Sequence, residues 1–281
     1  MKVAIIFDKK REDTMGIYFE KALSEASFSY RHFWLRDAAG IKQEFDVYLR
    51  IDDGDYANDL PCELRPCAFW ISDTHLKKPF KSISKQAKHY DFVFCAMKEG
   101  LAALSKAGIK ALWSPAACDS DIHKRLNTGK KFDIGYVGND GGSPRKFYLQ
   151  EIRERYPSSF LGNAPYTKMS EIYSASKIGF NYIRPGESIT MRCMEIMSCG
   201  AMLLVNRIKD GSAQDLGYRD KESLVFYDTP DELFKLIDYY VKNDVEREKI
   251  ADAGFKLTVS EHTYKNRLNE ILSTVSRNIC A

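Results

Sequence analysis

Two segments of the sequence place basic side chains at a helix start directly after a predicted strand. In the first, GYVGNDGGSPRK at 135–146, a strand leads into a glycine-rich turn that contains Gly138 and Asn139, and a helix begins at the Ser-Pro pair. Arg145 and Lys146 fall in the first helical turn, where the macrodipole makes cations unfavourable. An anion would remove this conflict, and phosphate is the natural candidate. The loop is neither a Walker A motif nor a clean GxGxxG motif, so charge on a solvated helix start is the alternative.

The second segment, ESITMRCMEIMSCG at 187–200, predicts a helix capped by Thr190 and ended by Gly200. Arg192 and Glu195 are three residues apart and therefore share one face of this helix. A pair that stabilises its own helix by about 0.2–0.5 kcal/mol is one explanation. However, Arg192 also lies in a first helical turn, just after the carboxyl end of a strand, where ligands bind in open α/β sheets.

Asp73 and His75 follow the apolar run CAFWIS, which predicts a further strand. Because that strand end belongs to the ligand-binding edge of a parallel sheet, both side chains are candidates for proton transfer. The ordinary pKa of histidine, near neutrality, suits this role. The alternative for either residue is a structural hydrogen bond.

Three features suggest metal binding but have simpler explanations. The run DDGD at 52–55 contains a DxD pattern and is typical of a turn. Asp119, Asp121 and His123 lie in a polar stretch and are better explained as a helix cap. The seven cysteines are scattered and include no CxxC pair. We therefore expect no essential metal ion.

The elements that position these residues are predicted from short apolar runs that alternate with helical stretches. The runs are MKVAIIF, YRHFWL, FDVYLRI, CAFWIS, FVFCA, ALWSP, IGYVG, FLG, IGFNYI, AMLLVN and LVFYD. Such alternation predicts parallel sheets with crossover helices, so the fold class is α/β. A polar stretch at 118–131 divides the chain into two halves, with the boundary near residues 124–131. Residues 230–278 predict three helices, and the last has an apolar stripe of Tyr264, Leu268, Ile271, Leu272 and Val275.

Composition narrows the function classes. The 281 residues are 44% hydrophobic and 29% charged, which is typical of a folded globular chain and excludes disorder and coiled coil. A net charge of +3 is far below that of a protein that coats nucleic acid. The sequence contains no apolar run long enough to span a bilayer, and an acid at position 8 interrupts any signal-peptide core, so we expect a cytoplasmic protein.

The stretch from Ile178 to Asn206 resembles the donor-binding core of GT-B glycosyltransferases, especially the group-1-like class that includes the spore-maturation glycosyltransferases. Glu187 and Glu195 have the E-x7-E spacing of that superfamily. The resemblance extends through IGYVGN, the helical tail, YLRIDDGDY, FWISDTHL and WSPAACDSDIH. It implies that Glu195 holds the donor ribose. The residues that it implies for the donor diphosphate are Arg192, Arg145 and Lys146.

This resemblance implies a GT-B architecture, in which two Rossmann-like domains face each other across a cleft. The acceptor-side domain would comprise residues 1–126 and the donor-binding domain residues 127–260. The helix within 261–281 would pack back on the N-terminal domain. The implied activity is metal-independent transfer of a sugar from a nucleotide-sugar, with a UDP-sugar the expected donor, to a hydroxyl group.

A narrower similarity is to phage DNA glucosyltransferases, which contain segments similar to SITMRCMEIMS and FWISDTHLKKPF. It implies that Asp73 is the catalytic base. The other catalytic candidates are His75, because of its ordinary pKa, and Glu187 of the E-x7-E spacing. Glu187 and Glu195 favour retention of the anomeric configuration, whereas the match at Asp73 favours inversion. We favour retention, because a carboxylate beside the reacting groups has roles other than that of a base.

The acceptor is left open by the sequence: a polysaccharide, a protein, a small molecule or a hydroxylated DNA base. Two other functions on the same architecture are a nucleotide-sugar epimerase and a non-catalytic nucleotide-sugar-binding protein, since a fold does not determine the reaction.

Overall fold

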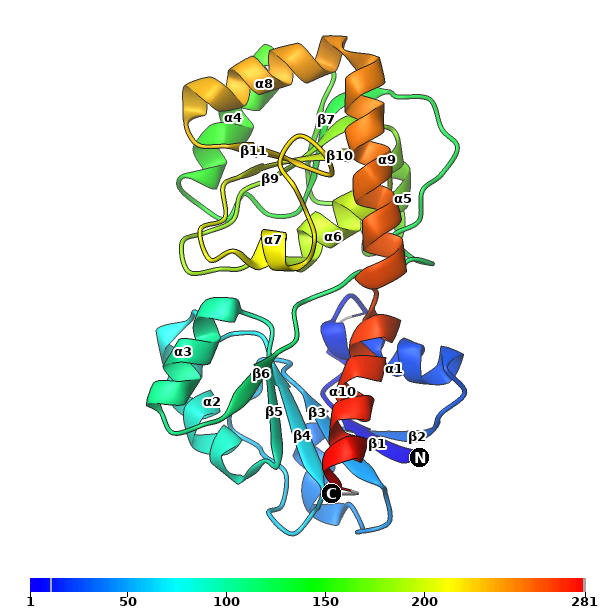
Figure 1. The fold of residues 1–281 in the computed structure, drawn as a ribbon, viewed down its shortest axis with the longest axis vertical. Coiled ribbons are helices and arrows are strands. Elements are labelled where there is room, and N and C mark those ends of the chain that lie inside the picture. Colours follow the sequence, from blue (N-terminus) through cyan, green and yellow to red (C-terminus); the bar gives the residue numbers. More distant parts are fainter. Residues whose placement is uncertain (11, 280–281) are drawn as a thin grey trace. The chain divides into compact units, whose positions relative to one another are not determined.

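The computed structural model describes residues 1–10 and 12–279, which form two compact α/β units (Figure 1). Unit 1 comprises Met1–Ala116, Gly186–Ser188 and Tyr264–Ala281. Unit 2 comprises Ala117–Pro185 and Ile189–Thr263. The predicted boundary after residue 126 therefore falls inside unit 2. The reason is that the backbone N–H groups of Lys124 and Leu126 donate to Ser170 Oγ and Ser174 Oγ of unit 2, at 3.0 and 2.9 Å.

Unit 1 is built on a six-stranded sheet in which every neighbouring pair is parallel. Its strands, in the order β2-β1-β3-β4-β5-β6, are β1 (Lys2–Ile6), β2 (Ser29–Phe33), β3 (Val47–Ile51), β4 (Cys67–Ile71), β5 (Phe92–Cys95) and β6 (Ala111–Trp113). Its helices are α1 (Met15–Glu25), η1 (Leu35–Gly40), α2 (Lys77–Gln86), η2 (Ala87–His89), α3 (Lys98–Lys106) and α10 (Tyr264–Ile279). Apolar side chains of η1, α2 and α3 form a core with one face of this sheet.

Unit 2 has a five-stranded parallel sheet with the order β11-β10-β9-β7-β8. The strands are β7 (Phe132–Val137), β8 (Phe160–Gly162), β9 (Ser176–Asn181), β10 (Met202–Asn206) and β11 (Val225–Tyr227). The helices are α4 (Arg145–Arg155), η3 (Tyr166–Lys168), α5 (Met169–Ser174), α6 (Met191–Ser198), α7 (Ser212–Asp215), α8 (Pro230–Lys242) and α9 (Asp244–Glu261). Side chains of α4 and α8 pack on one face, and those of α5 and α6 pack on the other.

All eleven predicted strands and the three predicted C-terminal helices occur in the structure. In both units the chain forms its first, second and third strands in the order 2-1-3, so each sheet has a switch point between its first and third strands. These points lie between β1 and β3 in unit 1, and between β7 and β9 in unit 2. Ligands of open α/β sheets bind beside the carboxyl ends of the strands at such a point.

The last helix, α10, packs within unit 1. The ring of Tyr264 stacks on Tyr18 of α1 at 5.2 Å and meets Phe19 edge-on at 5.1 Å. The stripe predicted for this helix is buried throughout, with no member more than 3% exposed. The sequence predicted a helix on the N-terminal domain here, and the apolar stripe is the physical reason for its docking.

One helix start differs by a residue from its prediction. Pro144, expected in the first helical position, is the N-cap of α4, which begins at Arg145. Gly141 and Gly142 have φ values of +64° and +76°, so the chain is still in a left-handed turn just before Ser143. Arg145 and Lys146 nevertheless remain in the first turn. No helix within the described residues has the length and apolarity that crossing a membrane requires.

Candidate active site

The glycine-rich turn of unit 2 leaves β7 at the switch point of the sheet. Gly138 has a φ of +140°, which side chains rarely tolerate, and a methyl group there would lie 2.7 Å from Arg192 Nη2. Its N–H donates to Gly162 O of β8 at 2.9 Å. The turn therefore needs glycine for both its conformation and its closeness to a guanidinium.

Arg192 joins the two strands on either side of the switch point. Its Nε donates to Val137 O at the end of β7 at 3.1 Å, and its Nη1 donates to Asn181 Oδ1 at the end of β9 at 3.3 Å. The guanidinium also lies 5.1 Å from the centre of the Tyr136 ring. Thr190 is the N-cap of α6, as predicted, so a cation is fixed in a helix first turn at the ligand-binding edge.

Two further arginines approach the same turn. Arg145 donates to Tyr182 O at 2.9 Å and to the Tyr136 hydroxyl at 3.4 Å. Its Nε is buried and has no hydrogen-bond partner among the described residues. Arg184, which follows β9, donates to Gly141 O at 2.9 Å. Three guanidinium groups thus surround a glycine turn, which is an environment suited to an anion such as diphosphate.

A pocket of about 510 Å³ opens beside this turn. Gly138, Asn139 and Lys146, which the sequence predicted to bind the donor, are among its lining residues. Asn139 and Lys146 are exposed, so both side chains are accessible to a ligand. The pocket continues between α4 and the end of β8, with Leu149, Gln150, Arg153, Leu161, Gly162 and Asn163 in its wall.

Glu195 is only 4% exposed, although the sequence assigned it to the polar face of α6. Its Oε1 lies 3.5 Å from Nε2 of His123, a side chain with no exposed surface. The backbone carbonyl of His123 in turn accepts a hydrogen bond from Ser198 Oγ at 2.5 Å. The sequence interpretation of His123 as part of a helix cap misses this contact, because His123 and Glu195 are 72 positions apart.

In unit 1, Asp73 lies among polar groups at the carboxyl edge of the sheet. The Tyr56 hydroxyl donates to Asp73 Oδ2 at 3.1 Å. The neighbouring carboxylate of Asp52 accepts from the backbone N–H of Asp73 at 3.2 Å, and from the N–H and hydroxyl of Ser72 at 3.0 and 3.1 Å. Asp73 is therefore anchored from its backbone side, while its carboxylate accepts a hydrogen bond from the Tyr56 hydroxyl.

These surroundings change the acidity of Asp73. Burial raises the pKa of Asp73 most, and the charge of Asp52 raises it further, whereas the Tyr56 hydrogen bond and His75 oppose the rise. Burial and the two carboxylates also raise the pKa of Tyr56, so its hydroxyl stays protonated and donates. A carboxyl with a raised pKa is closer to the value that general base catalysis near neutrality requires.

His75 and Glu187, the other two catalytic candidates, meet within unit 1. His75 Nε2 lies 3.4 Å from Glu187 Oε1, and the two side chains are 16% and 11% exposed. His75 Nδ1 is buried without a hydrogen-bond partner among the described residues. Glu187 belongs to the short segment Gly186–Ser188, which lies in unit 1 although its flanking residues lie in unit 2.

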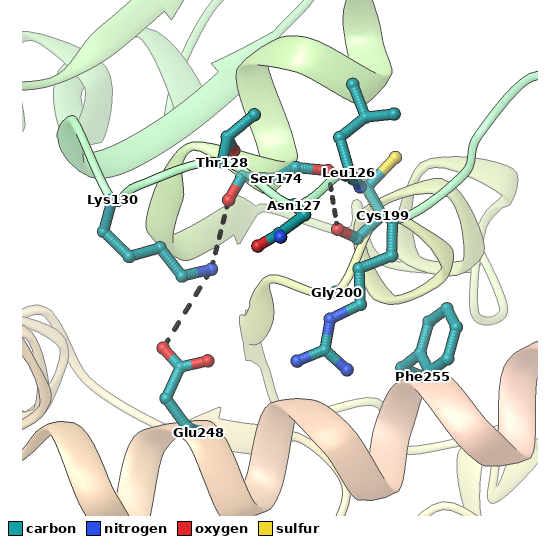
Figure 2. A pocket seen from close by; sticks show the side chains of 10 residues that line it. Leu126, Asn127, Thr128, Lys130, Ser174, Cys199, Gly200, Glu248 and Phe255 are labelled. Atoms are coloured by element: carbon teal, nitrogen blue, oxygen red, sulfur yellow. Dashed lines mark hydrogen bonds and ion pairs between the residues drawn. The ribbon is translucent and has the colours of Figure 1, made fainter.

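A second pocket in unit 2, of about 410 Å³, is a different kind of site (Figure 2). Lys130 enters it but donates to Ser174 O and Ser176 O at 3.2 and 2.9 Å, and lies 4.0 Å from Glu248. Arg125 pairs with Asp252 at 3.0 Å. These cations already have partners and precede β7, at the amino edge of the sheet, so we do not assign the donor to this pocket.

The run at 52–55 is a turn, as the sequence indicated. The segment around Asp119 is also a turn and not the predicted helix cap, because no helix lies between β6 and β7 within the described residues. Asp55 N–H donates to Asp53 Oδ1 at 2.9 Å, and Asp121 N–H donates to Asp119 Oδ1 at 3.0 Å. Within residues 1–10 and 12–279, no three or more His, Cys, Asp or Glu side chains are grouped so that they could hold a metal ion. Metal independence of the reaction stays a prediction.

Comparison with known proteins identifies the family. The model of the family described as "Glycosyl transferase-like" matches residues 120–273, more than half of the chain. The protein belongs to this glycosyltransferase family. No curated protein sequence matches the chain.

Solved structures similar to this glycosyltransferase cover nearly its whole length. HepE of Anabaena, in complex with UDP and glucose, aligns with a TM-score of 0.69 at 10% identity and covers 99% of this chain and 100% of its own. An α-glucosyltransferase in complex with UDP gives 0.71 at 9% identity, with 98% and 100% coverage. A DNA-modifying β-glucosyltransferase gives 0.67 at 14% identity, with 98% and 99% coverage. The glycosyltransferase thus has the GT-B fold.

Three residues of the candidate site do not follow from the sequence pattern. Arg184 follows β9 in the tripeptide Arg-Pro-Gly, and its position after a strand was the available signal. Asp52 and Tyr56 lie in YLRIDDGDY, a segment that was noted only for its resemblance and as a turn. Their role depends on the pairing of β3 with β4, which brings Asp52 beside Asp73.

Proposed function

We propose that this glycosyltransferase transfers a hexose from a UDP-sugar to a hydroxyl group, with the donor bound by unit 2. The observation that supports this most is the convergence of Arg145, Arg184 and Arg192 on the glycine turn at the switch point. UDP is the favoured nucleotide because the HepE and α-glucosyltransferase structures contain it. Guanidinium groups and a helix start would stabilise the leaving UDP, as a metal ion does in other enzymes.

The candidate residues of unit 2 then have separate roles in donor binding. Arg145, Lys146 and Arg192 bind the diphosphate. The turn at Gly138 and Asn139 lets the donor approach the backbone. We assign the ribose to Glu195, the second glutamate of the E-x7-E spacing.

In the transfer step, the acceptor oxygen attacks the anomeric carbon and the bond from that carbon to the UDP oxygen breaks. Asp73 takes the acceptor proton, and the electron pair of the broken bond leaves with UDP. A single displacement of this kind inverts the anomeric carbon, so a base role for Asp73 departs from the retention expected from the sequence. His75, paired with Glu187, is the second candidate for the base. The anomer of the product, measured by NMR, decides between inversion and the retention that the E-x7-E spacing favours.

Nucleotide binding tests the assignment first. UDP at about 100 times its Kd should add about 2.7 kcal/mol to the free energy of unfolding. Thermal shifts with UDP, GDP, ADP and dTDP, with and without EDTA, should show the largest stabilisation with UDP and no effect of the chelator. The proposal fails if none of the four nucleotides stabilises the protein. Conversion of a nucleotide-sugar into its epimer without acceptor would instead identify an epimerase.

A second observation favours DNA carrying a hydroxylated base as the acceptor. α2 and η2 follow Asp73 in the chain and expose lysines that form no ion pair within 4 Å among the described residues: Lys77, Lys78, Lys81, Lys85 and Lys88. Lysines four residues apart on a helix are about 6 Å apart along its axis and form one cationic stripe. The β-glucosyltransferase is described as a DNA-modifying enzyme, and an α-glucosyltransferase structure contains DNA with a modified base.

Replacing Lys78, Lys81 and Lys85 together by alanine should weaken binding of a DNA duplex with hydroxymethylated bases. The slope of log K against log salt is negative, and each lost phosphate contact reduces its magnitude by about 0.9. Loss of three contacts should therefore reduce the magnitude by about 2.7. Fluorescence anisotropy at several salt concentrations measures it. The matched control replaces Lys235, Lys242 and Lys249, which are exposed on α8 and α9. Equal slopes in the two triple variants would exclude the stripe as a DNA-binding surface.

A further inference from the structure

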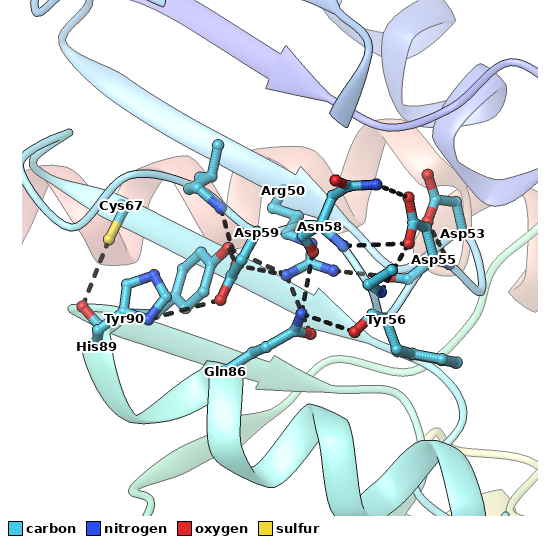
Figure 3. Close-up of polar contacts among 12 residues, drawn as sticks. Arg50, Asp53, Asp55, Tyr56, Asn58, Asp59, Cys67, Gln86, His89 and Tyr90 are labelled. Atoms are coloured by element: carbon cyan, nitrogen blue, oxygen red, sulfur yellow. Dashed lines mark hydrogen bonds and ion pairs between the residues drawn. The ribbon is translucent and has the colours of Figure 1, made fainter. Parts of the chain in front are cut away.

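A completely buried arginine lies in the middle of a central strand of unit 1. Arg50 is on β3, where every residue is buried, and its own side chain is 1% exposed (Figure 3). Its guanidinium stacks 4.3 Å from the centre of the Phe69 ring. Burying a charge costs several kcal/mol unless hydrogen bonds compensate for lost hydration, so an arginine in this position requires specific partners.

Two of those partners lie on the loop between β3 and β4, and Gln86 and Tyr90 provide two longer contacts to Nη1 at 3.3 and 3.4 Å. Arg50 Nη2 donates to Asp55 O at 2.9 Å, and Nη1 donates to Asp59 Oδ1 at 2.6 Å. The two contacts flank Tyr56. Gln86 of α2 holds the same stretch from another side, because its Nε2 donates to Tyr56 O at 3.3 Å and to Asn58 O at 2.9 Å. The backbone before, at and after Tyr56 is therefore fixed from inside the unit.

Tyr56 connects this buried network to the candidate base. The Tyr56 hydroxyl donates to Asp73 Oδ2. Tyr56 itself is half-buried, although Gly54, Ala57 and Asn58 in the same loop are exposed. An exposed loop without internal anchors would not hold a side chain in one place, because ordering each residue costs conformational entropy. The anchoring by Arg50 and Gln86 meets this requirement.

We propose that Tyr56 tunes the base Asp73 through its hydrogen bond, and that buried Arg50 is a positioning residue that holds Tyr56 in place. The inference rests on the proposed function, because it takes Asp73 as the group that accepts the acceptor proton. It goes beyond that function by assigning the acidity of the base to a loop held by a residue that does not touch Asp73.

The groups around Asp73 define the expected direction. Asp52 repels its negative charge. Tyr56, His75 and the Ser72 hydroxyl favour the ionised form, and Glu187 faces His75. Loss of the Tyr56 hydroxyl removes a stabilising hydrogen bond from the carboxylate, so the pKa of Asp73 should rise further. A base with a higher pKa stays protonated to higher pH, so the acid limb of the rate profile moves upward.

The first test replaces Tyr56 by phenylalanine. The acid limb of kcat/KM for transfer from UDP-glucose should move up by about 1 pH unit, and UDP affinity should be unchanged. The matched control is Tyr156→Phe, since the Tyr156 hydroxyl donates to the Asp238 carboxylate at 2.7 Å in unit 2. An acid limb that stays in place in Tyr56→Phe, or moves equally in the control, overturns the proposal.

The second test asks whether Arg50 acts through Tyr56. Arg50→Lys keeps the charge but lacks the two-pronged geometry that reaches Asp55 and Asp59, and it should shift the acid limb in the same direction. The double variant with Tyr56→Phe should shift it no further than Tyr56→Phe alone. A loss of stability with an unmoved acid limb would show that Arg50 is only structural. Should Arg50→Lys not fold, Gln86→Ala takes its place with the same expectation.

A readout without catalysis separates this inference from the proposed function. The Asp73 carboxyl is titrated by carbon NMR in the parent and in Tyr56→Phe, with Asp73→Asn to identify its signal. A higher pKa in Tyr56→Phe supports the coupling even if no nucleotide-sugar is a substrate. An unchanged pKa contradicts it even if transfer occurs.

Discussion

Asp73→Asn should lower kcat for transfer by about 10²–10⁴-fold, the range for loss of a general base, while the protein stays at least as stable as the parent at neutral pH. Burial and Asp52 raise the pKa of Asp73 in the folded protein above its unfolded value. Ionisation therefore disfavours the folded state. Its penalty is absent below the unfolded pKa, grows as the pH rises towards the folded pKa, and is complete above it. Asparagine removes the charge and can still accept the Tyr56 hydrogen bond.

The measurements are kcat and KM with saturating UDP-glucose, and thermal unfolding between pH 4 and pH 8. The stability difference between variant and parent should grow with pH in this window. A carboxylate that only orients the acceptor would raise KM instead of lowering kcat. Unfolding of Asp73→Asn with normal transfer per folded molecule would make Asp73 structural. If transfer collapses only in His75→Ala, the imidazole is the base.

Arg192→Ala should weaken UDP binding by about 1.5–3 kcal/mol, or roughly 10- to 150-fold in Kd, because it removes a charge-assisted contact to the diphosphate. The same change should also affect stability, because Arg192 donates hydrogen bonds within the protein. Val137 O and Asn181 Oδ1 would lose their donor from Arg192. A buried acceptor without a partner costs about 1–3 kcal/mol, so the variant should also be less stable.

Calorimetric titration with UDP, at a temperature where the variant is folded, measures this effect. Arg155→Ala is the matched control. Arg155 is the last residue of α4, away from the glycine turn, and pairs with Glu151 at 2.8 Å on the surface. Arg192→Lys separates the contribution of the charge from that of the geometry. Lysine keeps the positive charge but lacks the planar guanidinium that contacts both β7 and β9. Unchanged UDP affinity in Arg192→Ala would remove Arg192 from the donor site.

The helices and strands of this glycosyltransferase can be predicted from local sequence patterns alone. All eleven strands, the three C-terminal helices and the apolar stripe of α10 follow from local hydrophobic periodicity, which needs no knowledge of distant contacts. Local patterns also predict five of the donor-binding candidates, because a glycine turn or a helix start after a strand can be recognised within a dozen residues. These candidates are Gly138, Asn139, Arg145, Lys146 and Arg192. Periodicity also indicated two halves, but it placed their boundary inside unit 2.

The sequence pattern does not predict which strand ends lie side by side, because this depends on the order of the strands in each sheet. Parallel pairing of β3 with β4 brings Asp52 to Asp73, and the loop between them returns Tyr56 to the same carboxylate. Pairing of β7 with β9 lets Arg192 join both strands. Strand order and burial arise from contacts between residues far apart in sequence, whose spacing has no period to detect. The acidity of Asp73 depends on those contacts, because burial and neighbouring charges determine a pKa.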